Sequence, residues 1–355
     1  MYDLRSDVLA PLAPAVLQAL AAAAQRQPGF GRHEDEEERR LVREAADLCG
    51  FEDGLFVPTG TLANQIALRL WCAPGEAVLA ERESHVAVNE VAATAALNGV
   101  VVRPVEGRRG HLAPAMVEAA LAIRSGSASE RRTRLVWLEN THNRAGGTVM
   151  PAGWLDGIAA ICRGRGLHLH VDGARIWHAA VAAGTAPAEA VRGASSVMVG
   201  LNKILGAPVG ALLLASRDAI DEAARIQKMF GGLWRPVGPL AAAARVALAG
   251  YRPRAKAAHE AAAVFAARLA AELGNAVCDP VPDTNIVMLD FGGEAAVDAL
   301  LTRLSDQPVR VAPYRNGRVR CVLHAGLSPR DARDAAELIC RAAPDAPDQA
   351  CGDGP

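Results

Sequence analysis

Residues 167–175 read LHLHVDGAR, an apolar run with alternating side chains that ends in a charged segment. Its length and alternation predict a buried β-strand. Asp172 closes this run, and Arg175 follows three residues later. Because ligands of open α/β sheets bind at the carboxyl ends of the strands, this position indicates a ligand site. An internal ion pair between Asp172 and Arg175 is the simpler alternative.

Similar apolar runs recur on both sides of this stretch. Seven strands are expected, at 54–58, 77–81, 100–105, 134–140, 167–172, 195–201 and 209–215. Most of the intervening segments have helical periodicity, as 61–71 and 151–166 do. This alternation of strands and helices predicts an α/β fold with a mostly parallel seven-stranded sheet covered by helices on both faces. The last two strands are joined by a loop too short for a crossover, so we expect them to be antiparallel.

After Ser216 the pattern changes to a smaller α+β arrangement. Helices are expected over 217–230 and 237–273, near 294–305 and from Ser328, with strands within 283–291, 309–313 and 318–324. We therefore predict four parts: an N-terminal segment (1–15), a large α/β domain (16–245), a small C-terminal α+β domain (246–342) and a disordered tail (343–355).

Composition excludes several classes of function. Of the 355 residues, 38 are basic and 39 are acidic, so neither nucleic acid nor an anionic membrane is an expected partner. No apolar run is long enough to span a bilayer. The seven cysteines include no CxxC pair, which predicts reduced thiols in a cytoplasmic protein and no metal site.

Residues 58–64, PTGTLAN, follow an expected strand and open an expected helix. Unpaired backbone N–H groups and the helix dipole make such a terminus suitable for a phosphate group. Gly60 would allow close approach of the ligand, and Thr59 and Thr61 would add hydroxyl donors. An ordinary helix cap would also explain the motif.

Residues 201–210, LNKILGAPVG, place Lys203 directly after an apolar strand. A lysine in apolar surroundings has a lowered pKa and forms imines readily, although a surface lysine is the commoner case. A phosphate cradle, a carboxylate for a pyridinium nitrogen and an imine-forming lysine are what pyridoxal 5′-phosphate (PLP) requires. The three motifs together therefore predict a PLP site.

With these motifs in place, the chain resembles the threonine aldolases, within the fold-type I, aspartate aminotransferase-like PLP enzymes. The resemblance covers most of the chain and is carried by Leu4-Arg5-Ser6-Asp7, PTGTLAN, Ser84-His85, LENTHN (138–143), HVDGAR (170–175), LNKILGAPVG and Arg318-Val319-Arg320. It implies cleavage of a β-hydroxy-α-amino acid of the L-threonine or L-allo-threonine type to glycine and an aldehyde. It also implies a homodimer or homotetramer with active sites at the subunit interface.

The resemblance also implies roles for individual residues. Lys203 would bind the cofactor covalently, Asp172 would pair with its ring nitrogen, and His85 would stack on the ring. The phosphate would be held by Thr59, Gly60 and Thr61. Substrate binding would fall to Ser6, Arg175, Arg320 and His142, with Arg175 also contacting the cofactor. His85, His142 or a bound water would act as the base.

The chain departs from the family pattern at three places. Phe30-Gly31-Arg32-His33 stands where Tyr-Gly-Asp-Asp is common, Asn202 stands where serine is common, and 125–132 lacks a histidine that many members carry. These changes leave the substituent on the substrate β-carbon open. The alternatives are β-elimination, an aldolase for a bulkier substrate such as phenylserine, and a PLP-binding protein without turnover.

Overall fold

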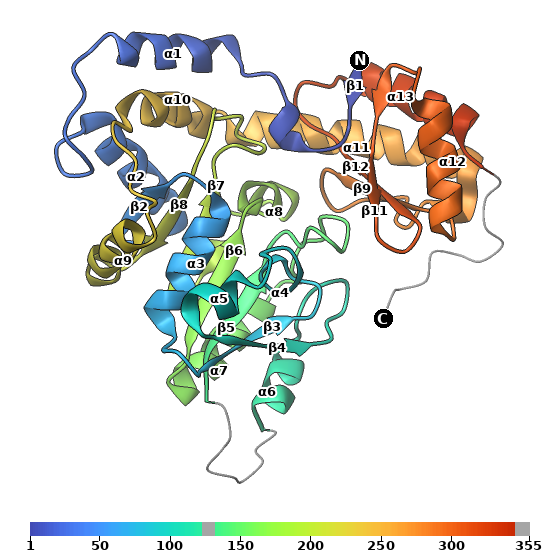
Figure 1. Cartoon of the computed structure of the whole chain (residues 1–355). Helices are drawn as coiled ribbons and strands as arrows, with labels where there is room; N and C mark the ends of the chain where they lie inside the picture. The colour runs from blue at the N-terminus through green and yellow to red at the C-terminus, as the bar shows by residue number, and fades with distance from the viewer. Residues whose placement is uncertain (123–131, 345–355) are drawn as a thin grey trace. The chain divides into compact units, whose positions relative to one another are not determined.

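The computed structural model describes residues 1–122 and 132–344 (Figure 1). They divide into two compact units. The large unit comprises Leu12–Arg144 and Met150–Gly250, and the small unit comprises Met1–Pro11, Ala145–Val149 and the chain from Tyr251 onward. Nearly all of the predicted tail and of the 125–132 loop lie outside the described residues. The four predicted domain bounds stay a prediction.

A seven-stranded sheet forms the centre of the large unit. Its strands are β2 (Asp53–Val57), β3 (Ala77–Glu81), β4 (Val101–Val105), β5 (Thr133–Glu139), β6 (His168–Gly173), β7 (Ser196–Gly200) and β8 (Ala211–Ala215), in the order β2-β8-β7-β6-β5-β3-β4. The strands from β7 to β4 are parallel, whereas β8 is antiparallel to both β7 and β2. The prediction of a mostly parallel sheet with an antiparallel last pair is confirmed.

Helices follow most of these strands in the large unit. They are α1 (Pro14–Ala24), α2 (Glu36–Cys49), α3 (Gly60–Trp71), α4 (His85–Val88), α5 (Ala93–Asn98), α6 (Pro114–Ala122), α7 (Trp154–Arg165), α8 (Ile176–Ala182), α9 (Arg217–Met229) and α10 (Gly238–Ala249). Local sequence explains the ends of α2. The Asp35 side chain accepts a hydrogen bond from the Glu38 N–H, and Gly50 ends the helix at φ 74°.

The small unit contains α11 (Tyr251–Leu273), α12 (Glu294–Leu304) and α13 (Pro329–Ala342). Its antiparallel sheet has the order β11 (Ala312–Tyr314), β12 (Arg318–Val322), β9 (Ile286–Asp290), and β1 (Tyr2–Asp3) pairs with β10 (Val309–Arg310). Phe265 and Leu269 of α11 share one apolar core with Ile339 and Leu289. The expected helical stretch 237–273 is divided at Gly250 into α10 and α11.

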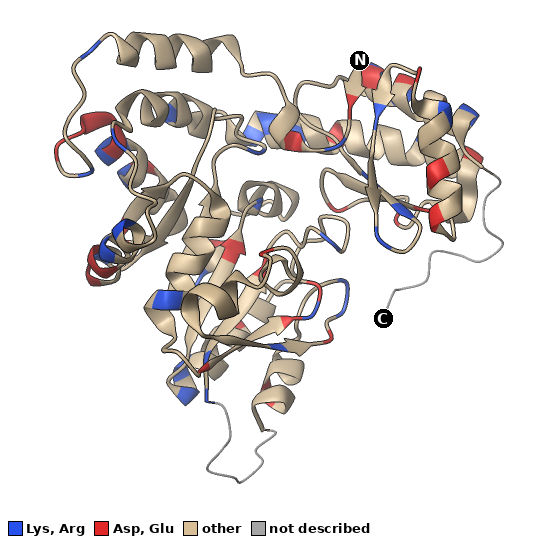
Figure 2. Cartoon of the chain, viewed as in Figure 1, with Lys and Arg blue, Asp and Glu red and all other residues tan. Residues whose placement is uncertain are grey.

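The charged residues and the cysteines were compared with what the sequence predicts. Basic and acidic residues occur on both units (Figure 2). Cys49, Cys72, Cys162, Cys321 and Cys340 are free thiols, but Cys278 is disulfide-bonded, so the expectation of reduced thiols throughout is wrong at Cys278. In the described part of the chain, no helix is both long and apolar enough to cross a membrane.

Candidate active site

The carboxyl edge of the large sheet collects the predicted motifs. Asp172 is the next-to-last residue of β6, and Lys203 lies three residues after β7 ends at Gly200. Strand β2, which runs in the same direction as β7 because both are antiparallel to β8, ends just before Thr59. Parallel strands end at the same edge, so the topology brings the three motifs to one side of the sheet.

Two glycines let the ends of β6 and β7 lie close together there. A Cβ atom on Gly200 would lie 2.6 Å from the carbonyl oxygen of Ala174, and one on Gly173 would lie 2.7 Å from that of Met198. Real Cβ atoms do not approach backbone this closely. The two glycines therefore fix the chain path directly beside Asp172 and before Lys203.

The N-terminus of α3 presents an exposed face. The Thr59 hydroxyl caps the helix by accepting from the Leu62 N–H at 3.1 Å. Thr59 and Thr61 are exposed and Gly60 is half-buried. The first N–H groups of any helix lack an intrahelical acceptor, and the dipole favours an anion there. These residues thus fit the phosphate group that the sequence predicts.

Asp172 is only 2% exposed and is held by two hydrogen bonds. Its Oδ1 accepts from the Ala174 N–H at 3.1 Å, and its Oδ2 accepts from the Asn64 side-chain amide at 2.8 Å. Asn64 belongs to the quoted PTGTLAN motif, but the sequence reasoning gave it no role. Its signal was a polar residue four positions after Gly60 on an otherwise apolar helix face.

His85 begins α4 and is anchored at two points. Its backbone N–H donates to Glu139 Oε2 at 2.6 Å, and its ring Nδ1 lies 2.9 Å from Glu90 Oε1. Burial alone would lower the pKa of His85, but the hydrogen bond to Glu90 and the charges of Asp172 and Glu139 raise it overall. The side chain remains 32% exposed, so a ligand can reach the ring.

His142 has a different environment. It is fully buried, and its Nε2 lies 3.0 Å from Glu81 Oε2. Burial would lower the pKa of His142, whereas Glu139 and Glu81 raise it overall. The next residue, Asn143, contacts Arg175. The Asn143 side-chain oxygen accepts a hydrogen bond from Arg175 Nη1 at 3.0 Å, and this bond fixes the buried guanidinium at the start of α8.

The remaining predicted residues divide between the units. Lys203 is half-buried in the connection from β7 to β8 of the large unit. Ser6 and Arg320 belong to the small unit. There, Arg320 Nη2 donates to the Arg5 carbonyl at 3.2 Å, and Ser6 Oγ accepts from the Val8 N–H at 3.4 Å. The small unit therefore brings Ser6 and Arg320 close together.

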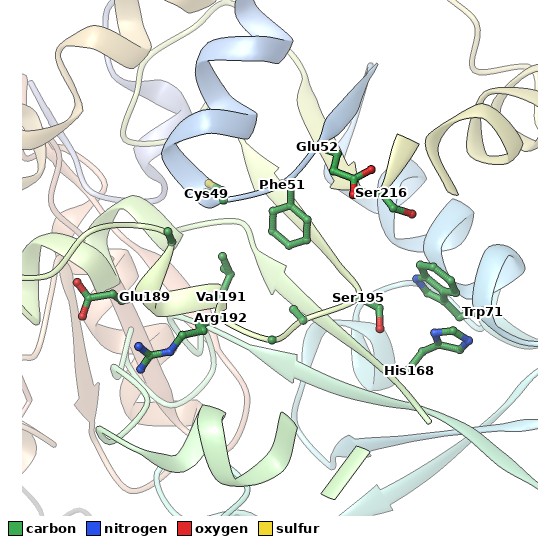
Figure 3. A pocket seen from close by; sticks show the side chains of 14 residues that line it. Cys49, Phe51, Glu52, Trp71, His168, Glu189, Val191, Arg192, Ser195 and Ser216 are labelled. Atoms are coloured by element: carbon green, nitrogen blue, oxygen red, sulfur yellow. The ribbon is translucent and has the colours of Figure 1, made fainter. Parts of the chain in front are cut away.

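A cavity of about 600 Å³ lies at the other edge of the large sheet (Figure 3). Its lining includes His168 at the start of β6, Ser195 before β7 and Ser216 after β8. The His168 ring stacks on Trp71 with centroids 4.1 Å apart. None of the predicted site residues lines this cavity.

The sheet order and the placement of the motifs define the chain as an α/β protein of the fold-type I class. Solved structures agree: the threonine aldolase of Leishmania major matches with a TM-score of 0.79 at 24% identity, covering 96% of this chain and 99% of that one. A family model described as "Beta-eliminating lyase" matches residues 3–293. The chain belongs to the beta-eliminating lyase family.

Curated relatives point to one branch of that family. Low-specificity L-threonine aldolase 1 of Arabidopsis thaliana is 32% identical over 333 residues, which cover 93% of this chain and 92% of the relative. Low specificity L-threonine aldolase of Escherichia coli K12 is 37% identical over 297 residues, covering 83% and 86%. The resemblance to threonine aldolases that the motifs indicated is confirmed.

Proposed function

We propose that this chain is a PLP-dependent aldolase. It cleaves the Cα–Cβ bond of a β-hydroxy-α-amino acid of the L-threonine or L-allo-threonine type and releases glycine and an aldehyde. The observation that carries the proposal is the gathering of Asp172, Lys203 and the start of α3 at one edge of the large sheet. The names of the relatives support the reaction and the substrate class.

The choice of lysine follows from the small number available. The chain contains three lysines, Lys203, Lys228 and Lys256. Lys228 and Lys256 are exposed on helices α9 and α11. Lys203 alone among them follows a strand of the large sheet at its carboxyl edge. We therefore assign covalent attachment of the cofactor to the Lys203 amine.

The residues around the site suit the other parts of the cofactor. Asp172 would accept the ring N–H, with Asn64 and Ala174 holding the carboxylate still. Thr59, Gly60 and Thr61 would bind the phosphate through hydroxyl and backbone N–H groups. When bound, PLP supplies an electron sink for the electrons left on the substrate Cα. A buried carboxylate needs a cationic partner of this kind.

Two histidines were candidates for the base that removes the β-hydroxyl proton. A base must come within hydrogen-bond reach of that proton. His85 is partly exposed, whereas His142 is fully buried beside Glu81. The geometry therefore favours His85, or a water that it orients, over His142. We assign His142 to fixing the loop that carries Asn143, whose side chain in turn holds Arg175.

The substrate carboxylate needs a cationic partner. Arg175 offers a guanidinium held by Asn143, and an arginine fork binds a carboxylate through two parallel hydrogen bonds. Ser6 and Arg320 stay predictions for the same carboxylate, supported by the resemblance. The homodimer or homotetramer and the cytoplasmic location also stay predictions.

The test separates aldol cleavage from the alternatives by its products. The purified protein is incubated with PLP and L-threonine, L-allo-threonine or L-phenylserine, and aldehyde, glycine, ammonia and keto acid are measured. We expect aldehyde and glycine in equal amounts, with the rates ranking the substrates. Ammonia and a keto acid would show elimination instead. PLP binding without any product would support a binding protein without turnover.

A further inference from the structure

A second buried carboxylate lies beside the proposed site and has no role so far. Glu90 is 4% exposed. Its Oε1 accepts from the Asn64 amide at 2.7 Å and pairs with His85 Nδ1 at 2.9 Å, while its Oε2 accepts from the Gln65 amide at 2.5 Å. Because a carboxylate can only accept, His85 carries its proton on Nδ1 in this pair.

Asn64 connects this carboxylate to Asp172. The same Nδ2 group donates to Glu90 at 2.7 Å and to Asp172 at 2.8 Å, and Asn64 is fully buried. One polar atom each from His85, Glu90 and Asp172 lie within 4.8 Å of one another. Two carboxylates and one imidazole are thus gathered in a space from which water is largely excluded.

Asp172 and Glu90 place two buried carboxylates beside the proposed ring site. Buried carboxylates are costly without cationic partners. In the form that can act as a base, His85 donates from Nδ1 to Glu90, has no proton on Nε2 and carries no charge. Glu139 is also nearby, but its two oxygens accept from the backbone N–H groups of His85 and Asn143. A pyridinium N–H at Asp172 would supply a positive charge close to both carboxylates.

We propose that Glu90 is a positioning residue of this site. It fixes the His85 ring through Nδ1 and holds Asp172 in place through Asn64. It also adds a second negative charge, which favours a cationic cofactor. This inference rests on the proposed function, because it assumes that PLP binds at Asp172. Glu90 need not touch the substrate or the cofactor, since it acts through His85 and Asn64.

Glutamine cannot replace Glu90 without loss. Glu90 meets three donors, from Asn64, Gln65 and His85. A glutamine would offer one acceptor oxygen and an NH₂ group, so a donor would face a donor. Gln65 cannot easily reverse its amide, because its Oε1 accepts from Asn98 Nδ2 at 2.8 Å.

The test is a pH titration of the absorption band of PLP bound to the full-length protein, without substrate. A negative charge this close favours every cationic N–H group near it, so its removal lowers their pKa values. We expect the midpoint of the titration to fall by about 1 unit or more in Glu90→Gln. Glu90→Ala removes the same charge without adding a misplaced donor, so the midpoint should fall by the same amount. This second variant keeps the test possible if Glu90→Gln does not fold.

Two controls separate charge from structure. Gln65→Leu breaks a hydrogen bond to the same carboxylate but keeps its charge, so the midpoint should stay at the wild-type value. Glu106→Gln changes a carboxylate that is 59% exposed and should have no effect. If Glu90 acted only by holding its neighbours in place, Gln65→Leu would shift the titration midpoint as the Glu90 variants do.

The outcomes distinguish this inference from the proposed function. An unchanged midpoint in both Glu90 variants overturns the role of Glu90 and leaves the aldolase proposal standing. A wild-type protein that binds PLP but forms no aldehyde overturns the aldolase proposal, whereas a lower midpoint in the variants would still support Glu90. A wild-type protein without any PLP band overturns both.

Discussion

At the scale of single residues, Asp172 is the side chain whose charge the proposed chemistry needs most. Asn at this position would keep one acceptor oxygen for Asn64 or Ala174 but lose the negative charge. We expect Asp172→Asn to lower kcat/KM by about 10²-fold or more, because a preorganised charge is lost from a buried site. Steady-state kinetics with the preferred substrate measure this.

The matched control is Asp156→Asn. Asp156 is 51% exposed and pairs with Arg192 on the surface, so its loss should leave kcat/KM unchanged. If Asp172→Asn stayed within about threefold of the wild-type kcat/KM, the buried carboxylate would not act as the partner of the cofactor ring.

Gly200 sets the close approach of β6 and β7. A Cβ there would lie 2.6 Å from the Ala174 carbonyl oxygen, so one of the two strands must shift. We expect Gly200→Ala to reduce the free energy of unfolding by about 1–3 kcal/mol, the usual cost of overpacking. Urea unfolding followed by circular dichroism measures it.

Gly164 provides the matched substitution for that experiment. It lies within α7, and nothing lies within 4 Å of a Cβ built there. Gly164→Ala should therefore stabilise the protein by about 0.5–1 kcal/mol, since alanine favours the helix. Equal effects of the two substitutions would show that the spacing between β6 and β7 is not constrained.

At the scale of elements, the buried first turn of α2 makes stability depend on pH. Burial and then the charge of Asp35 raise the pKa of Glu38 from 4.5 to about 7. Between these values the unfolded chain has lost the proton that the folded chain still holds. Stability therefore falls as pH rises from 4.5 to about 7 and then levels off.

Glu38→Gln removes this titration. The variant should gain stability over the wild type as pH rises, by up to about 3 kcal/mol above pH 7. Urea midpoints of both proteins at about pH 5 and about pH 8 measure the gain. The same difference between the two proteins at both pH values would mean that Glu38 titrates normally in the folded chain.

The sequence pattern was informative for elements and less so for their contacts. Apolar periodicity located all seven strands of the large sheet, because burial on both faces leaves a local signal. Glu90 lies 26 residues from Asn64, and only the folded chain brings the two together. Its surroundings, VNEVA, look like an exposed turn. The hydrogen bonds from Asn64, Gln65 and His85 explain why a carboxylate is tolerated there.

In the small unit too, the sequence does not reveal contacts between residues far apart in the chain. Strand β1 pairs with β10 across most of the chain, with Tyr2 opposite Val309. A two-residue strand has no periodicity to detect. The motif LRSD at residues 4–7 was visible in the sequence, yet its contact with Arg320 through the Arg5 carbonyl depends on this long-range pairing.

At the scale of the whole molecule, cofactor binding should be coupled to stability. A ligand that binds only the folded state adds about 2.7 kcal/mol at one hundred times its Kd. For a chain of this size, PLP should raise Tm by roughly 3–5 °C. Differential scanning fluorimetry with and without PLP measures the shift.

Lys203→Ala should show a smaller rise in Tm than the wild type, because the non-covalent contacts of the phosphate and the ring remain. Lys228→Ala, on the exposed face of α9, should match the wild type. A wild-type Tm that does not respond to PLP would contradict binding in the folded large unit.

The central claim is that Lys203, beside Asp172, carries the cofactor. It is tested most directly by reducing the PLP-loaded protein with borohydride, digesting it and locating the pyridoxyl group by mass spectrometry. With only three lysines in the chain, the assignment is unambiguous. We expect the group on the peptide that contains Lys203 and not on Lys228 or Lys256. Modification confined to either of those two lysines, or no modification, would contradict the claim.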